Sequence, residues 1–178
     1  MRILSTVIIT ALILTVIAAC STSPTGRSQV KLFSSDRLNS MGSQTFASLK
    51  TEQKVSNKRI ENQYVRCIAD ALIPFIPADT FDGEWEVVVF DDEQINAFAL
   101  PGGKIGVYTG ILNVAKTPDQ LASVMGHEIG HVIAEHGNER MSIATLSNLG
   151  LQITNVGLKS AGVTDSNQAL MMAGAGLL

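Results

Sequence analysis

The stretch GHEIGHVIAEH, residues 126–136, holds the side chains best suited to chemistry. Two histidines, His127 and His131, are four residues apart, and Glu128 directly follows the first of them. On a helix, this spacing brings both imidazoles to one face on neighbouring turns, so that both can reach a single metal ion. A glutamate beside them can accept a proton from water that the metal has made acidic. The spacing therefore predicts a zinc site for peptide-bond hydrolysis, with His127 and His131 as ligands and Glu128 as the catalytic base.

The alternative is a chance H-E-x-x-H pattern on a surface helix. Against it, the chain has three histidines in 178 residues, and two of them occupy the motif. A separate apolar arc of the same helix is expected to face the core, and it consists of Leu121, Met125, Ile129, Val132 and Ile133. A helix with an apolar arc and a distinct histidine face favours metal binding over coincidence.

Two glycines lie inside the same helix. Gly126 and Gly130 fall together on a third arc, and each costs roughly 1 kcal/mol relative to alanine in a helix interior. We interpret them as a place where the backbone of a neighbouring element approaches closely.

A zinc site of this kind needs a third protein ligand. His136 lies nine residues after His127, which is about half a turn away around a continuous helix. We therefore expect His136 to point away from the metal and to pack on the apolar side in the last turn, where it complements the helix dipole.

The acidic residues after the motif are also weak candidates. Glu135 is one turn beyond His131, a position better suited to a hydrogen bond to a ligand than to binding the ion itself. Glu139 and Asp165 are the others, and Asp165 lies in the polar turn TDSN, where a solvated helix cap is ordinary. The residues therefore identify no third ligand.

The motif helix has a well-marked beginning. Thr117 suits the N-cap, Pro118 suits the first helical position, and Gln120 completes a capping box. Gly137 and Asn138 mark its expected end. The segment that follows is rich in Gly, Ala and Leu, and we expect it to be helical with breaks near residues 157–159 and 162–165.

The elements before this helix predict an α+β fold. Residues 36–76 have helical character with a break near residues 55–57, and EWEVVVF, residues 84–90, is typical of a strand. Residues 96–100 and 104–108 form two short extended runs that are joined by a turn at Pro101-Gly102-Gly103. We expect a small sheet with helices packed on it.

The first residues form a predicted export signal rather than part of the fold. Residues 1–19 combine Arg2 with an apolar run, as export signals do. The alternative interpretation is a membrane anchor, but the apolar run is short for one. The sequence IAAC, residues 17–20, resembles the lipobox of bacterial lipoproteins, which implies lipidation at Cys20. Residues 20–30 are small and polar and predict a flexible tether, followed by a domain over residues 31–178. Cys67, the second cysteine, is expected to be a buried, inert thiol.

The segments NAFALPGGKIGVYTGIL and TPDQLASVMGHEIGHVIAEHGNERMS resemble the HtpX- and Oma-like zinc metallopeptidases, in particular their bacterial outer-membrane lipoprotein branch. The resemblance implies a zincin-like fold of the gluzincin type (metallopeptidase family 48), with His127 and His131 as zinc ligands and Glu128 as the base. The third ligand of that family is a glutamate on a later helix in an E-x-x-A-D motif, which this sequence lacks. We therefore expect the chain to be the N-terminal part of the catalytic domain, with the third ligand beyond residue 178.

The resemblance also implies a location and a substrate class. A lipid at Cys20, followed by Ser21, implies the periplasmic face of the outer membrane, with unfolded or misassembled envelope polypeptides as substrates. An edge strand over Asn96, Ala97, Phe98 and Ala99 is expected to pair with extended substrate backbone. An alternative is an inactive lipoprotein that binds unfolded segments without cutting them. The net charge of −3 and the absence of a basic run argue against a nucleic-acid partner.

Overall fold

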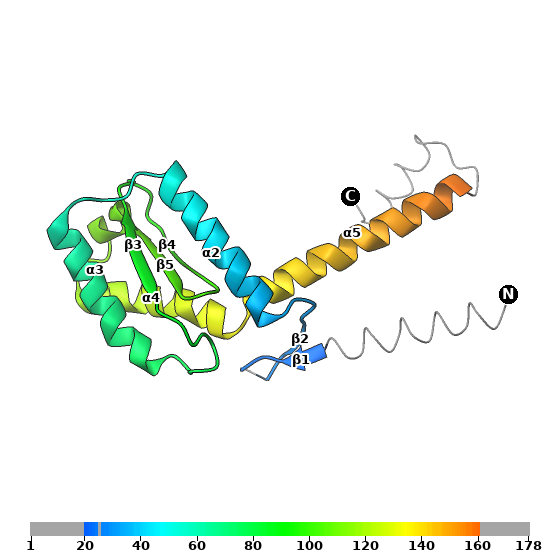
Figure 1. The fold of residues 1–178 in the computed structure, drawn as a ribbon, viewed down its shortest axis with the longest axis horizontal. Coiled ribbons are helices and arrows are strands. Elements are labelled where there is room, and N and C mark those ends of the chain that lie inside the picture. The colour runs from blue at the N-terminus through cyan, green and yellow to red at the C-terminus, as the bar shows by residue number, and fades with distance from the viewer. Residues whose placement is uncertain (1–19, 25, 161–178) are drawn as a thin grey trace.

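Three strands form the central sheet of the computed structural model, which describes residues 20–24 and 26–160. They are β3 (Glu86–Phe90), β4 (Ala97–Leu100) and β5 (Lys104–Tyr108). The strand order is β3-β5-β4, with β5 parallel to β3 and antiparallel to β4 (Figure 1). The β4–β5 turn falls where the sequence predicts it, with Gly102 at φ 82° and Gly103 at φ 68°, a backbone conformation that favours glycine.

Helices surround this sheet and confirm the predicted α+β class. Their bounds are α2 (Ser35–Glu52), α3 (Arg59–Leu72), the 3-10 turns η1 (Ile73–Phe75) and η2 (Thr109–Asn113), α4 (Pro118–Ile133) and α5 (His136–Ser160). The predicted break near residues 55–57 separates α2 from α3, and Val55 in this break forms a bridge to Phe90 of β3.

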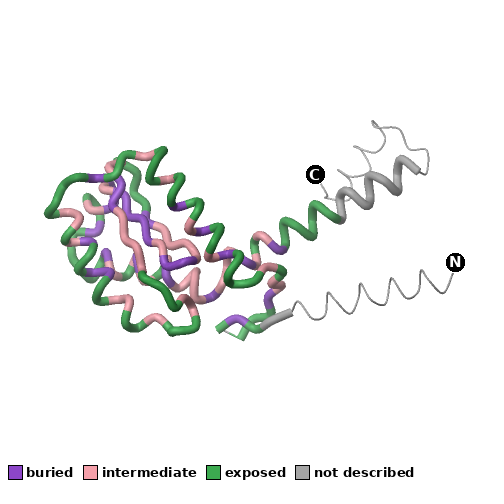
Figure 2. Tube along the Cα trace, viewed as in Figure 1, coloured by how far each residue is buried: buried purple, intermediate pink, exposed green. Residues whose placement is uncertain are grey.

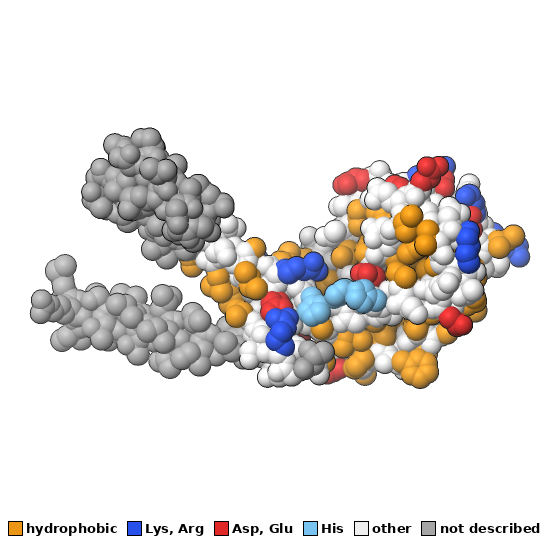
Figure 3. Space-filling model, turned by 180° about the vertical axis from the view of Figure 1, so that it is seen from behind, with side chains coloured by type: hydrophobic (Ala, Val, Ile, Leu, Met, Phe, Trp, Pro, Cys, Tyr) orange, Lys and Arg blue, Asp and Glu red, His pale blue; other side chains and the backbone are white. Residues whose placement is uncertain are grey.

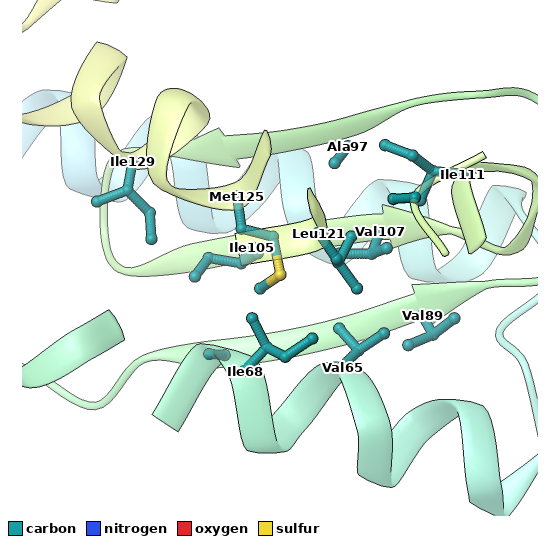
Figure 4. Close-up of a cluster of buried hydrophobic side chains, with 12 residues drawn as sticks. Val65, Ile68, Val89, Ala97, Ile105, Val107, Ile111, Leu121, Met125 and Ile129 are labelled. Atoms are coloured by element: carbon teal, nitrogen blue, oxygen red, sulfur yellow. The ribbon is translucent and has the colours of Figure 1, made fainter. Parts of the chain in front are cut away.

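The two faces of the sheet pack against different helices because successive side chains of a strand point to opposite sides. Val89 packs with α3 and α4 in the larger core, which Figure 4 shows between these helices and the sheet. Its neighbour Phe90 points the other way and packs with Phe46 of α2 and with Tyr108. Burial is highest on β5, where four of the five residues are buried, whereas β3 and β4 are mostly of intermediate burial (Figure 2). Both faces are therefore covered, and α4 is held on the sheet by its apolar arc.

Helix α3 is rotated relative to the sequence prediction. Cys67 is exposed, so the expectation of a buried thiol is wrong. The side chains of α3 that are buried are Val65, Ile68 and Ala69. The apolar residues of this helix occupy a broad arc, and packing against β3 and α4 selects the edge that excludes Cys67.

Helix α4 begins as predicted but ends earlier. Thr117 accepts a hydrogen bond from the Gln120 backbone, and the capping box is complete. The helix stops at Ile133, and Glu135 adopts a left-handed φ of 51° before α5 starts at His136. We call residues 134–136 the elbow. Helix α5 then continues to Ser160, so the expected break at residues 157–159 is wrong, whereas residues 162–165 lie outside the described part.

The segment predicted to be a tether contains a small hairpin. Strands β1 (Cys20–Thr22) and β2 (Ser28–Val30) pair antiparallel, and Gln29 is buried. Residues 1–19, the predicted export signal, lie outside the described residues. Among the residues that are described, no helix has the length and apolar character needed to cross a membrane.

Candidate metal centre

The polar face of α4 brings the two motif histidines together. The Nε2 atoms of His127 and His131 are 3.1 Å apart. On the opposite side of the helix, Leu121, Met125 and Ile129 are buried and fix its rotation on the sheet. Because the core anchors one side of α4, both imidazoles remain at the surface, where the histidine side chains form one patch in Figure 3.

The spacing of the two nitrogens fits a common metal ion. Two imidazoles on a tetrahedral zinc ion, each at about 2.0–2.1 Å, would have their nitrogens about 3.3 Å apart. The observed Nε2 separation of 3.1 Å is close to that value. Within residues 20–24 and 26–160, no group of three or more His, Cys, Asp or Glu side chains is arranged to hold a metal. The fitting donors are therefore the pair His127 and His131.

Glu128 lies at the same place on the surface. Its side chain is partly buried and borders a hollow of about 460 Å³. The residues around this hollow are Arg27, Glu128, His131, His136, Glu139 and Arg140. A carboxylate that faces the same space as His131 is placed to take a proton from water in that space.

His136 contradicts the expectation drawn from a continuous helix. It does not pack on the apolar arc: its Nδ1 atom lies 2.6 Å from Nδ1 of His131. The cause is the elbow, which turns the chain back after Ile133 and carries His136 to the metal side of α4. His136 contacts Nδ1 of the His131 ring, whereas His127 contacts Nε2 of that ring. His136 is therefore not placed to bind the same metal ion as a third ligand.

Glu135 also differs from its prediction. Its carboxylate forms an ion pair of 2.8 Å with Lys31 and accepts a hydrogen bond of 3.2 Å from Asn138. These contacts take the place of the expected hydrogen bond to a metal ligand. They help to hold the left-handed backbone of Glu135, which is unfavourable for a residue other than glycine.

Residues 27–33 run along the elbow and hold it, an arrangement that we call the clasp. The buried side chain of Gln29 donates to the Ala134 carbonyl at 2.9 Å. Asn138 joins the clasp twice, because its amide donates to the Phe33 carbonyl at 2.8 Å and its carbonyl accepts from the Phe33 N–H at 3.3 Å. These partners are more than 100 residues apart in sequence. The clasp therefore holds the N-terminal segment against the side of α4 that carries His127, Glu128 and His131, which we call the metal face.

An ion pair completes the clasp at its outer end. The guanidinium of Arg27 donates to both carboxylate oxygens of Glu139, at 2.6 and 2.5 Å. The hydrogen bond from Arg27 holds the pKa of Glu139 below its ordinary value, although desolvation opposes this effect. Because the pKa of Glu139 is lower in the folded than in the unfolded protein, its ion pair with Arg27 stabilises the fold above the ordinary glutamate pKa. This stabilisation is lost as the pH falls through the lowered pKa of Glu139.

Strand β4 lies at the edge of the sheet, as predicted. Its one strand partner among the described residues is β5, whereas the opposite edge, β3, is bridged by Val55. Ala99 borders a second hollow, of about 320 Å³, that also includes His131. The Phe98 ring instead packs on Phe46, on the other face of the sheet. The end of β4 is therefore close to the metal face through Ala99, and the substrate role of residues 96–99 stays a prediction.

The two glycines of α4 do not mark a close approach of another element. A Cβ atom built on Gly126 or on Gly130 meets nothing within 4 Å, so that expectation is wrong for the described residues. Gly42 of α2 is different, because a Cβ atom there would lie 2.1 Å from the Pro101 carbonyl oxygen.

These surroundings predict opposite effects for two substitutions of helical glycines. Gly126→Ala should stabilise the fold by about 0.5–1 kcal/mol, because alanine has the higher helix propensity and finds open space. Gly42→Ala should destabilise it, since backbone atoms at the β4–β5 turn would have to move. Chemical denaturation of both variants measures this difference, and destabilisation by Gly126→Ala would contradict the open surroundings of that residue.

The residues on this side of α4, together with the sheet, are typical of one class of protein. A helix that presents paired histidines and an adjacent glutamate, packed on a small sheet with a nearby edge strand, is an arrangement typical of metal-dependent hydrolases. The model of peptidase family M48 matches residues 56–178, and the chain belongs to this family. The members of this family are metallopeptidases, and the family implies a catalytic metal.

Similar proteins agree with this membership. The chain is 52% identical over 52 residues, 29% of the chain, to the mitochondrial metalloendopeptidase OMA1 of Arabidopsis thaliana. It is 30% identical over 129 residues, 68% of the chain, to a putative beta-barrel assembly-enhancing protease of Vibrio cholerae. It is 36% identical over 74 residues, 42% of the chain, to the metalloprotease LoiP of Escherichia coli. The matched stretches span 11%, 26% and 27% of the lengths of these relatives.

Proposed function

We propose that the protein is a zinc-dependent endopeptidase, lipid-anchored through Cys20 at the periplasmic face of a bacterial outer membrane, that cuts unfolded or misassembled envelope polypeptides. The observation that carries the proposal is the 3.1 Å separation of two Nε2 atoms beside Glu128 on one helix. Membership of a metallopeptidase family supports the reaction. The IAAC sequence at residues 17–20 and the Vibrio cholerae relative, named for beta-barrel assembly, support the location and the substrates.

The residues of this chain have distinct roles in the proposed reaction. When bound, zinc supplies a Lewis acid that polarises a carbonyl group and acidifies water. His127 and His131 would hold it through their Nε2 atoms. Glu128 takes the proton from the attacking water and delivers it to the leaving amine. The open edge of β4 pairs with extended substrate backbone and aligns it along the metal face.

Zinc content tests the proposed metal site directly. Equilibrium dialysis against dilute zinc, with elemental mass spectrometry as the readout, should show about one zinc ion per molecule bound through the His127–His131 pair. His131→Ala removes one of two fitting donors and should lose the metal, whereas His136→Asn keeps both donors and should retain it. Equal zinc content in the wild type and the His131→Ala variant would contradict the assignment of His131 as a ligand.

A further inference from the structure

The His131 ring has a neighbour at each of its two nitrogens. Nε2 lies 3.1 Å from Nε2 of His127, and Nδ1 lies 2.6 Å from Nδ1 of His136. The ring centroids of His131 and His136 are 4.9 Å apart with an interplanar angle of 53°. The second contact is therefore directed between ring nitrogens, as in a hydrogen bond, and is not merely a stacking of rings.

The chemistry of imidazole limits how these protons can be arranged. A neutral imidazole carries one N–H group, and a nitrogen that binds a metal must be free of a proton. If Nε2 of His131 is to face the metal, its proton must reside on Nδ1, where it needs a hydrogen-bond acceptor. The nearest such acceptor is Nδ1 of His136, provided that His136 carries its own proton on Nε2.

We propose that His136 is a positioning residue that accepts the Nδ1–H of His131 and so holds this ring with Nε2 open toward the metal. The inference rests on the proposed role of His131 as a ligand. Carboxylates and carbonyls commonly provide this contact to metal-binding histidines, and here a third histidine provides it.

The fold holds His136 in this place through the elbow. Glu135 at φ 51° reverses the chain, and Gln29 fixes the preceding carbonyl of Ala134. Asn138, two residues after His136, is buried. Its side chain accepts a hydrogen bond from the Phe33 N–H and donates one to the Phe33 carbonyl. Contacts therefore secure the backbone on both sides of His136 and hold this residue beside His131.

Two variants with the same number of side-chain heavy atoms separate the hydrogen bond from packing. His136→Asn places the side-chain oxygen near the original Nδ1 and keeps an acceptor, whereas His136→Leu fills similar space without one. If His136 acts only by packing, the two variants should behave alike. If it acts as an acceptor, the asparagine variant should resemble the wild type.

The first measurement is the proton position on His131 in the metal-free full chain. Long-range ¹H–¹⁵N spectra distinguish the two neutral tautomers at about pH 8.5, well above the ordinary histidine pKa of about 6.5. We expect the proton on Nδ1 in the wild type and in His136→Asn, and a shift toward Nε2 in His136→Leu. A proton on Nε2 of His131 in the wild type overturns the proposal, and this result does not depend on any variant folding.

The second measurement is zinc affinity by competition with a chelator. His136→Leu should bind zinc about 10–100-fold more weakly than the wild type, and His136→Asn within a few-fold of it. Equal affinities for the two variants overturn the proposal. If the wild type binds no zinc but carries the His131 proton on Nδ1, the proposed metal site is contradicted and the His131–His136 hydrogen bond is not. Failure of the metal site can therefore be distinguished from failure of the positioning role of His136.

Discussion

Glu128→Gln should lower the rate of peptide cleavage by about 10²–10⁴-fold while the zinc content stays unchanged. Glutamine has the shape of glutamate but cannot take a proton from water at neutral pH. Among the described residues, no hydrogen bond or ion pair involves the Glu128 side chain, so the substitution by glutamine breaks neither. The loss should therefore appear in kcat, without a change in thermal stability.

Hydrolysis of a fluorescence-quenched unfolded peptide measures this effect, with zinc content determined on the same samples. Glu52→Gln is the matched control, because Glu52 is an exposed residue at the end of α2, on a helix that does not carry the motif. Full cleavage by Glu128→Gln would exclude Glu128 as the base. If the wild type binds the peptide and zinc but does not cut, the protein binds unfolded segments without cleaving them, which is the alternative function.

Leu121→Ala should cost about 3 kcal/mol of folding free energy, the second large effect. Leu121 is fully buried, and Figure 4 shows its side chain next to Val107, between α4 and the sheet. Deleting its methyl groups leaves a cavity in the layer that positions the motif helix. For a chain of this length, the loss corresponds to a fall in Tm of about 10 °C.

The same truncation at the surface provides the control for this prediction. Leu149 lies on α5 and is 50% exposed, so Leu149→Ala should change the free energy of unfolding by no more than about 0.5 kcal/mol. Thermal unfolding monitored by circular dichroism compares the two variants. Similar Tm values for both would show that Leu121 does not belong to the core.

Features encoded by neighbouring residues could be predicted from the sequence. The cap at Thr117, the turn at residues 101–103 and the break between α2 and α3 each depend on residues a few positions apart. The spacing of His127 and His131 also depends on one helix turn, and the structure brings their Nε2 atoms together. Local patterns were sufficient for these elements because their geometry is local.

The elbow could not be predicted in this way. A left-handed glutamate is uncommon, and Gly137 and Asn138 offered a more familiar place for the helix to end. The contacts that hold Glu135 and Ala134 come from Lys31 and Gln29, more than 100 residues earlier in the chain. A wheel drawn for one continuous helix therefore placed His136 on the wrong side.

The orientation of α3 could not be predicted for a related reason. Its apolar residues cover a broad arc that allows more than one buried face. Contact with β3 and α4 selects Val65 and Ile68, and leaves Cys67 exposed. Periodicity identifies a helix, but the choice between adjacent faces depends on the partner against which it packs.

If Cys20 carries the proposed lipid, the clasp limits how far the face of α4 that carries His127 and His131 can lie from the membrane. Arg27, which binds Glu139 near the elbow, follows Cys20 by seven residues, and an extended chain spans at most about 3.5 Å per residue. The Cα atoms of Cys20 and Arg27 therefore lie within about 25 Å of each other, and the β1–β2 hairpin shortens this distance further. The metal face would therefore be held close to the membrane surface. Under the proposed function, a polypeptide would then have to come close to the membrane surface before the site could reach it.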